Sequence, residues 1–167
     1  MAVTTNILRT WRSPRVVIRE MLDGPEREDM AFAYLMVACF IIFVGQWPRL
    51  SRLAAGFDLA PGAETPELSR LVAYEFVSWM LVWPLVMFLL AMFSHFGAQL
   101  LGGQGTPYRA RLALFWSLLA STPVLLLYGL VRGFIGAGVE ANMVGIIWVV
   151  GFVVIWITTL KEAERAR

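Results

Sequence analysis

The chain has 167 residues, of which 59% are hydrophobic and 16% charged, and its mean hydropathy is +0.68. Soluble domains carry about 25% charged residues, so this composition excludes an ordinary soluble globule and indicates an integral membrane protein. The 14 basic and 12 acidic residues leave a net charge of +2 without a continuous basic stripe, which excludes nucleic-acid binding. One histidine and one cysteine, Cys39, are too few for a multi-histidine metal site or an internal disulfide, so we expect no metal and no cofactor.

Residues 1–29 are predicted to form a cytoplasmic amphipathic segment. They mix acids with bases and lack the apolar core of a signal peptide. Ser13 and Pro14 predict a helix start, as N-cap and first-turn proline, and the helix should end near residue 22. Its apolar stripe favours two placements equally, in the membrane interface or on the protein's own loops. The residues predicted to face the interface are Trp11, Val17, Ile18, Met21 and Leu22.

Four apolar stretches follow, at residues 31–47, 71–101, 112–131 and 143–160. Each approaches or exceeds the roughly 20 residues that cross a bilayer as a helix. Pro84 and Pro123 lie inside two of them and predict kinks. The predicted fold class is therefore all-α, a polytopic membrane helical bundle of four transmembrane helices preceded by an amphipathic interfacial helix. A membrane domain at residues 30–160 and a charged cytoplasmic tail at residues 161–167 complete the organisation.

The distribution of Lys and Arg predicts the orientation. With four spans both termini share one side, which carries ten basic residues, whereas the opposite side carries four. Short loops rich in Lys and Arg stay in the cytoplasm. We therefore expect a multi-pass protein of the bacterial cytoplasmic (inner) membrane with both termini cytoplasmic.

Small residues at helical spacing predict which faces of the spans meet, because leucine gains nothing from burial against leucine in lipid. Three such faces occur, and they predict packing within one chain, with a homo-oligomer as the alternative. They are Ala31, Ala38 and Gly45; Ala91, Ser94 and Ala98; and Ala113, Ser117, Ala120 and Ser121.

Two ionisable residues lie within the apolar stretches. Glu75 is one turn into the second span, near its outer end, and His95 lies near the cytoplasmic end of the same span. Such residues can belong to an ion or proton path, or they can be paired packing residues. We expect His95 to form a hydrogen bond with a backbone carbonyl or a hydroxyl near the following loop.

The loop Leu-Gly-Gly-Gln-Gly-Thr-Pro-Tyr at residues 101–108 is the most distinctive motif. It lacks the lysine and the preceding strand of a phosphate-binding loop, so a tight turn between helices is expected, with Thr106 as a cap. A late histidine, this loop and a following span with a central proline resemble the short bacterial branch of the Yip family, the Ypt-interacting membrane proteins. The positions that carry the resemblance are His95, Leu101, Gly102, Gly103, Gly105, Thr106, Tyr108, Ala110 and Pro123.

What this resemblance implies is a helical membrane protein without a settled activity. Eukaryotic members bind prenylated Rab-type GTPases, a role that we do not transfer to this chain. The sequence shows no nucleophile beside a base, so no catalytic residue is predicted. We expect a non-enzymatic scaffold or accessory subunit, with the lipid bilayer and another membrane protein as partners. The alternative is a transporter or channel component that uses Glu75 and His95.

Overall fold

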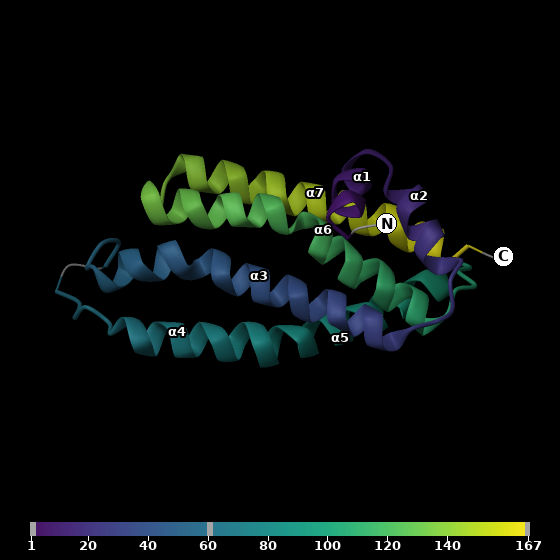
Figure 1. The fold of residues 1–167 in the computed structure, drawn as a ribbon, viewed down its shortest axis with the longest axis horizontal. Coiled ribbons are helices and arrows are strands. Elements are labelled where there is room, and N and C mark those ends of the chain that lie inside the picture. Colours follow the sequence, from purple (N-terminus) through teal and green to yellow (C-terminus); the bar gives the residue numbers. More distant parts are fainter. Residues whose placement is uncertain (1–2, 60–61, 166–167) are drawn as a thin grey trace.

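The computed structural model describes residues 3–59 and 62–165, and the regular secondary structure of this part of the chain is all helical (Figure 1). Four helices are long and apolar enough to cross a membrane, which confirms the predicted four-span bundle. The elements are α1 (Val3–Arg12), α2 (Pro14–Leu22), α3 (Glu28–Ala54), α4 (Leu68–Val77), the π-helical turn η1 (Ser78–Val82), α5 (Trp83–Leu100), α6 (Pro107–Phe134) and α7 (Val139–Ala163). The start of α1 and the end of α7 lie in the same half of the bundle (Figure 1).

The helices extend beyond the apolar stretches that predicted them. The first span, predicted over residues 31–47, runs from Glu28 to Ala54, and the last continues to Ala163. Charged residues at helix ends can reach water, so hydropathy detects only the central part of each helix. The predicted tail at residues 161–167 therefore begins inside α7, and Glu162 and Glu164 are buried rather than free in solution.

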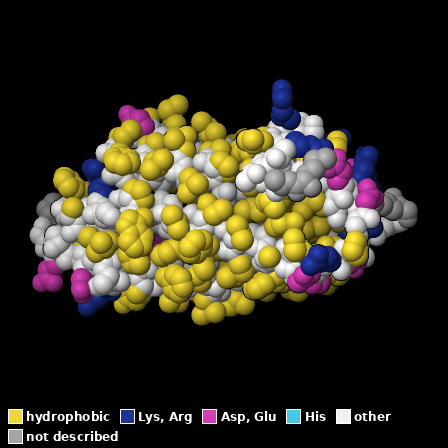
Figure 2. Space-filling model, viewed as in Figure 1, with side chains coloured by type: hydrophobic (Ala, Val, Ile, Leu, Met, Phe, Trp, Pro, Cys, Tyr) yellow, Lys and Arg dark blue, Asp and Glu magenta, His cyan; other side chains and the backbone are white. Residues whose placement is uncertain are grey.

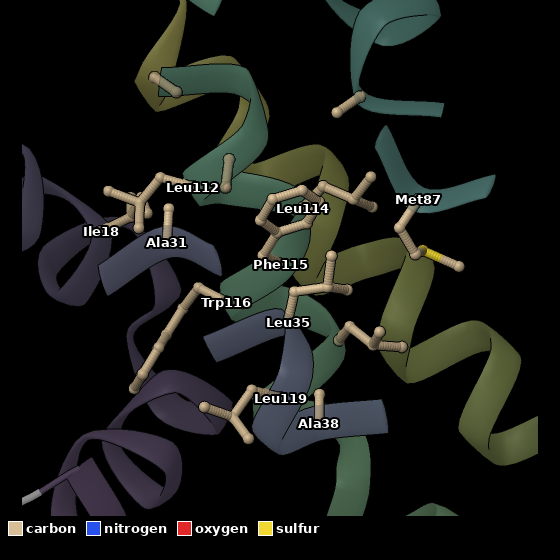
Figure 3. Packing of buried hydrophobic residues seen from close by; sticks show 14 of the residues in the cluster. Ile18, Ala31, Leu35, Ala38, Met87, Leu112, Leu114, Phe115, Trp116 and Leu119 are labelled. Atoms are coloured by element: carbon tan, nitrogen blue, oxygen red, sulfur yellow. The ribbon is translucent and has the colours of Figure 1, made fainter. Parts of the chain in front are cut away.

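Helix α6 is the centre of the bundle, and α3, α5 and α7 pack around it. Most of the small residues predicted to face other helices do so: Ala31, Ala38, Ala113 and Ser117 are fully buried. On α5, however, Ala91 is buried whereas Ser94 and Ala98 are only half-buried and line a groove. Ser117 also shares a hydrogen bond with Thr159 of α7 at 2.9 Å between the two hydroxyl oxygens. The close-up of the core shows Leu35 of α3 beside Leu114 and Phe115 of α6 (Figure 3).

A close contact between α3 and α6 is made by a pair of glycines on α6 that the sequence analysis missed. A Cβ at Gly129 would lie 1.9 Å from the carbonyl oxygen of Gly45, and one at Gly133 would lie 2.2 Å from the Cβ of Pro48. These glycines are four residues apart and form a Gly-x-x-x-Gly face, which allows two helix backbones to approach closely in lipid. The predicted Gly45 position belongs to the same contact.

Both intramembrane prolines alter their helices. The π-helical turn η1 immediately precedes Pro84 and separates α4 from α5. In α6, Pro123 has no N–H to donate to the carbonyl of Leu119, and the hydroxyl of Thr122 donates to it instead at 2.8 Å. The indole N–H of Trp11 bonds the next carbonyl, that of Ala120, at 2.9 Å. The indole of Trp11 thereby attaches the N-terminal segment to α6, one turn before Pro123.

This N-terminal segment requires a correction to the predicted interfacial helix. Val17 and Ile18 are fully buried, because α2 packs its apolar stripe on the bundle, mainly on α7, and not on lipid. Figure 3 shows Ile18 beside Leu112 and Ala31. Leu22 is buried in the same core, and Met21 packs against that core. Of the two placements that the sequence left open, the structure therefore shows the one on the protein itself. The helix begins at Pro14 as predicted, but the side chain of Ser13 makes no cap hydrogen bond.

The outer surface of the spans is strongly apolar. Figure 2 shows hydrophobic side chains over the middle of the molecule and charged side chains gathered toward its two ends. In the most apolar part of α6 more than half of the residues are buried, whereas few are buried in the span formed by α4, η1 and α5 or in α7. Lipid-facing surface is therefore concentrated on these outer helices.

Candidate functional site

A buried polar cluster lies at the end of the bundle that carries both termini. At its centre the carboxylate of Glu164 accepts a hydrogen bond from Nδ1 of His95 at 2.7 Å and another from the backbone N–H of Gly105 at 3.0 Å. The other ring nitrogen of His95 lies 3.1 Å from Nε2 of Gln99. A neutral imidazole that donates from Nδ1 to the carboxylate can accept from Gln99 at Nε2, which satisfies both nitrogens.

The glycine loop builds this cluster by wrapping around the end of α7. The backbone N–H of Gln104 donates to the carbonyl of Glu164 at 2.9 Å. A Cβ at Gly103 or Gly105 would come within 2.9 Å of the Glu164 carboxylate, so both positions require glycine for close approach. Gly102 has a φ of +89°, a turn conformation that glycine adopts without strain. The loop is therefore a turn, as expected, and it also holds the end of the fourth span.

The expected partner of His95 was wrong in its chemistry. We anticipated a backbone carbonyl or a hydroxyl, whereas the partner is a carboxylate 69 residues away in the chain. Nothing in the local sequence distinguishes Glu164 from the other acids of a charged C-terminal segment. One sequence signal could have indicated this partner: Glu164 follows the last apolar stretch by about one helical turn. At that place an acid can reach the loop between the second and third spans.

A second buried acid, Glu162, joins the N-terminal helices to the same end of α7. Arg19 of α2 donates to it twice, from Nε at 2.8 Å and from Nη2 at 2.5 Å. Arg165 adds a third hydrogen bond at 3.1 Å. The two acids of the last helical turn thus face different neighbours, with Glu162 bonded to α2 and Glu164 bonded to the glycine loop.

The remaining motif residues lie around this cluster. The hydroxyl of Thr106 caps α6 by accepting from the N–H of Arg109 at 3.4 Å, as predicted, and donates to Glu26 at 3.2 Å. Tyr108 is buried in the hydrophobic core. Pro123 is four turns further along α6 and takes no part in the cluster, since 15 residues of helix separate it from Tyr108, about 22 Å at 1.5 Å per residue. Its local effect is on the carbonyl of Leu119, to which the hydroxyl of Thr122 donates.

Glu75 lies in a separate polar site near the opposite end of the bundle. Its carboxylate forms an ion pair with Arg49 of α3 and accepts from the indole N–H of Trp79 at 3.1 Å. A groove of about 390 Å³ runs beside this pair. Twenty residues of one long helix separate Glu75 from His95, about 30 Å at 1.5 Å per residue. The structure therefore does not bring together the two residues of the transport alternative.

Compared with models of known protein families, with curated proteins and with solved structures, the chain matches none. Its class rests on its own architecture. Four apolar helices of membrane-spanning length form a bundle centred on α6. Two short N-terminal helices pack on this bundle, α1 on α6 and α2 on α7. The protein is a four-span helical membrane protein that associates with the lipid bilayer.

Proposed function

We propose that this protein is a non-enzymatic scaffold or accessory subunit of the bacterial cytoplasmic membrane, related in role to bacterial Yip family members. In this proposal both termini face the cytoplasm, and the protein packs against another membrane protein through α4 and α5. The likeness of the His95 and glycine-loop motif to the Yip family supports it. The observation that carries it is the outward face of the second span.

This face, the outer stripe, follows the full length of the span at steps of three or four residues. Its members are all exposed, with exposed fractions from 51% for Val77 to 90% for Leu100. Aromatic side chains are enriched in protein interfaces, and this stripe offers van der Waals packing to a partner helix, which would replace the lipid that otherwise covers these large side chains. The outer stripe consists of Tyr74, Val77, Leu81, Leu85, Leu89, Phe93, Phe96 and Leu100.

The polar clusters support a structural role over a transport role. The hydrogen bonds of His95 and Glu164 hold the glycine loop on α7, and those of Glu75 hold α4 on α3. Between them the second span buries Met87 and Ala91, which offer no polar path. The two sites therefore stabilise helix contacts separately, one at each end of the bundle.

Site-specific photo-cross-linking in the intact cell membrane tests this proposal. A photoreactive amino acid at Leu89 or Phe93, in the outer stripe, should give one defined protein adduct. The matched control is Ile147, which is 56% exposed on α7. The adduct should re-form when the purified full-length chain is mixed with the purified partner. Lipid adducts alone at all three positions would contradict the proposal, and an adduct with a second copy would make the chain a homo-oligomeric scaffold.

A further inference from the structure

A groove opens between the ends of α5 and α7, beside the cluster of His95 and Glu164, with a volume of about 680 Å³. This volume is in the range of small-molecule binding sites, about 300–1,000 Å³. One wall is the small-residue face of α5 at Ser94, Gly97 and Ala98, and the other is formed by Trp156 and its neighbours on α7. The groove is thus a mostly apolar slot between the C-terminal ends of two membrane-spanning helices, where each helix reaches the membrane surface.

The small residues explain why the slot exists. A Cβ at Gly97 would have no heavy atom within 4 Å, so no side chain from α7 fills the space in front of it. Both α5 and α7 pack on α6, and the loop bonded to Glu164 closes the slot at its polar end. The slot is therefore a feature of how α5, the glycine loop and the end of α7 are arranged.

The polar end of the groove is cationic. Lys161 and Arg165 line it and are exposed. Glu164 also lines the groove, but its carboxylate is buried and accepts hydrogen bonds from His95 and Gly105. The other acid of this turn, Glu162, is buried and paired with Arg19, so the exposed charges at this end are those of Lys161 and Arg165. Arg165 donates to Glu162 from Nη1, but a guanidinium has five N–H donors, so others remain for a ligand.

Trp156 lies deeper in the wall, five residues below Lys161 on α7, about 7.5 Å along the helix axis. Its indole N–H has no hydrogen-bond partner within the described residues, but protein atoms cover it, so Trp156 contributes ring surface to the groove and not an exposed donor. In a glycerophospholipid the acyl chains likewise lie deeper than the phosphate, so one molecule presents an anion at the rim and apolar surface further in.

We propose that this groove binds one anionic glycerophospholipid, with an acyl chain between α5 and α7 and its phosphate at Lys161 and Arg165. Basic pockets between membrane helices are suited to anionic head groups, because each Lys or Arg near the surface contributes attraction of about 1 kcal/mol. The proposal depends only on the protein spanning a bilayer, and not on its partner or orientation. Its occupant is the lipid, and not a free phosphate ion or a helix of another protein.

Lipid retention by the purified full-length chain tests the proposal. The protein in mild detergent is mixed with equal amounts of phosphatidylglycerol and phosphatidylcholine, washed, and analysed by quantitative mass spectrometry of the extracted lipid. Phosphatidylglycerol should be enriched, and the double substitution K161Q/R165Q should reduce this enrichment about thirtyfold. Arg12→Gln, at the same end of the molecule but outside the groove, is the matched control and should retain the enrichment.

A second variant tests the apolar slot. Gly97→Leu places a side chain in open space, so it should fold normally and lower the retention of phosphatidylglycerol severalfold. A fluorescence measurement gives a readout that does not depend on the other variants. Brominated phosphatidylglycerol should quench the tryptophan fluorescence of the wild-type protein more than that of Trp156→Phe, because Trp156 lines the groove. Equal retention of the two lipids, loss of the enrichment on addition of inorganic phosphate, or a protein helix cross-linked at Gly97 would each overturn the proposal.

Discussion

At the scale of single residues, Glu164 joins the second span to the loop that follows it. Its carboxylate accepts hydrogen bonds from the side chain of His95 on α5 and from the backbone N–H of Gly105 in the glycine loop. Glu164 is 7% exposed and holds His95 and Gly105 together. Burying a carboxylate is unfavourable unless its hydrogen bonds are made, and here they are. One residue beyond the last turn of α7 thereby fixes the glycine loop at residues 101–108.

We predict that Glu164→Ala destabilises the protein by about 1–3 kcal/mol, because it leaves two buried donors without an acceptor. Thermal unfolding in detergent measures this as a lowered Tm. Glu64→Ala, in the exposed loop between the first two spans, is the matched control and should leave the Tm unchanged. An equal Tm for Glu164→Ala and the control would show that the cluster contributes nothing to stability.

At the scale of helices, α6 is the element on which the others assemble. It contacts α3 through glycines, α7 through Ser117 and Thr159, and α1 through the carbonyl of Ala120 beside Pro123. Each contact uses a small or polar residue where two backbones approach. This agrees with the forces available in lipid, where van der Waals packing and hydrogen bonds associate helices and apolar burial does not.

We predict that Gly129→Leu separates α3 from α6 and destabilises the bundle by at least about 1–3 kcal/mol, the usual cost of overpacking. A leucine there would meet the backbone of Gly45, which cannot move aside as a side chain can. Gly97→Leu, in open space on α5, is the control. Thermal unfolding of the two variants side by side makes the comparison, and equal stabilities would contradict the assigned helix contact.

The contact between α1 and α2 should depend on pH. Arg9 donates to both carboxylate oxygens of Glu20, at 3.0 and 2.8 Å, and these hydrogen bonds lower the pKa of Glu20 below its ordinary value. A lowered pKa means that the stabilisation is present above the ordinary carboxyl pKa and is lost as the pH falls through the lowered one. The effect is small because the pair is at the surface.

Hydrogen exchange of the α1 backbone should therefore accelerate at acidic pH, beginning below the ordinary pKa of a glutamate. Glu20→Gln removes the titrating group, so in this variant the exchange, corrected for its intrinsic pH dependence, should lack the acid-induced step. The same step in Glu20→Gln would assign the pH dependence to another group.

At the scale of the whole molecule, four spans place both termini at one end, and the excess of Lys and Arg at that end predicts that it is cytoplasmic. A cysteine introduced at Ala63 should be labelled by a membrane-impermeant maleimide from outside the cell. The native Cys39 is fully buried in α3 and should stay unlabelled. A cysteine at Ser13, on the other side, should react only after the membrane is opened. Labelling in the reverse order would invert the orientation.

The sequence by itself determined the class, the four spans, the start of α2, the cap at Thr106 and the small-residue faces of α3 and α6. These follow from composition, helical periodicity and local backbone chemistry, which act over a few residues. The tertiary structure decided that α2 packs on the bundle and not on lipid, that Gly129 and Gly133 meet α3, and that Glu164 is the partner of His95. An apolar stripe, a glycine or a charge is compatible with several neighbours, and only the three-dimensional arrangement of residues distant in the chain selects one.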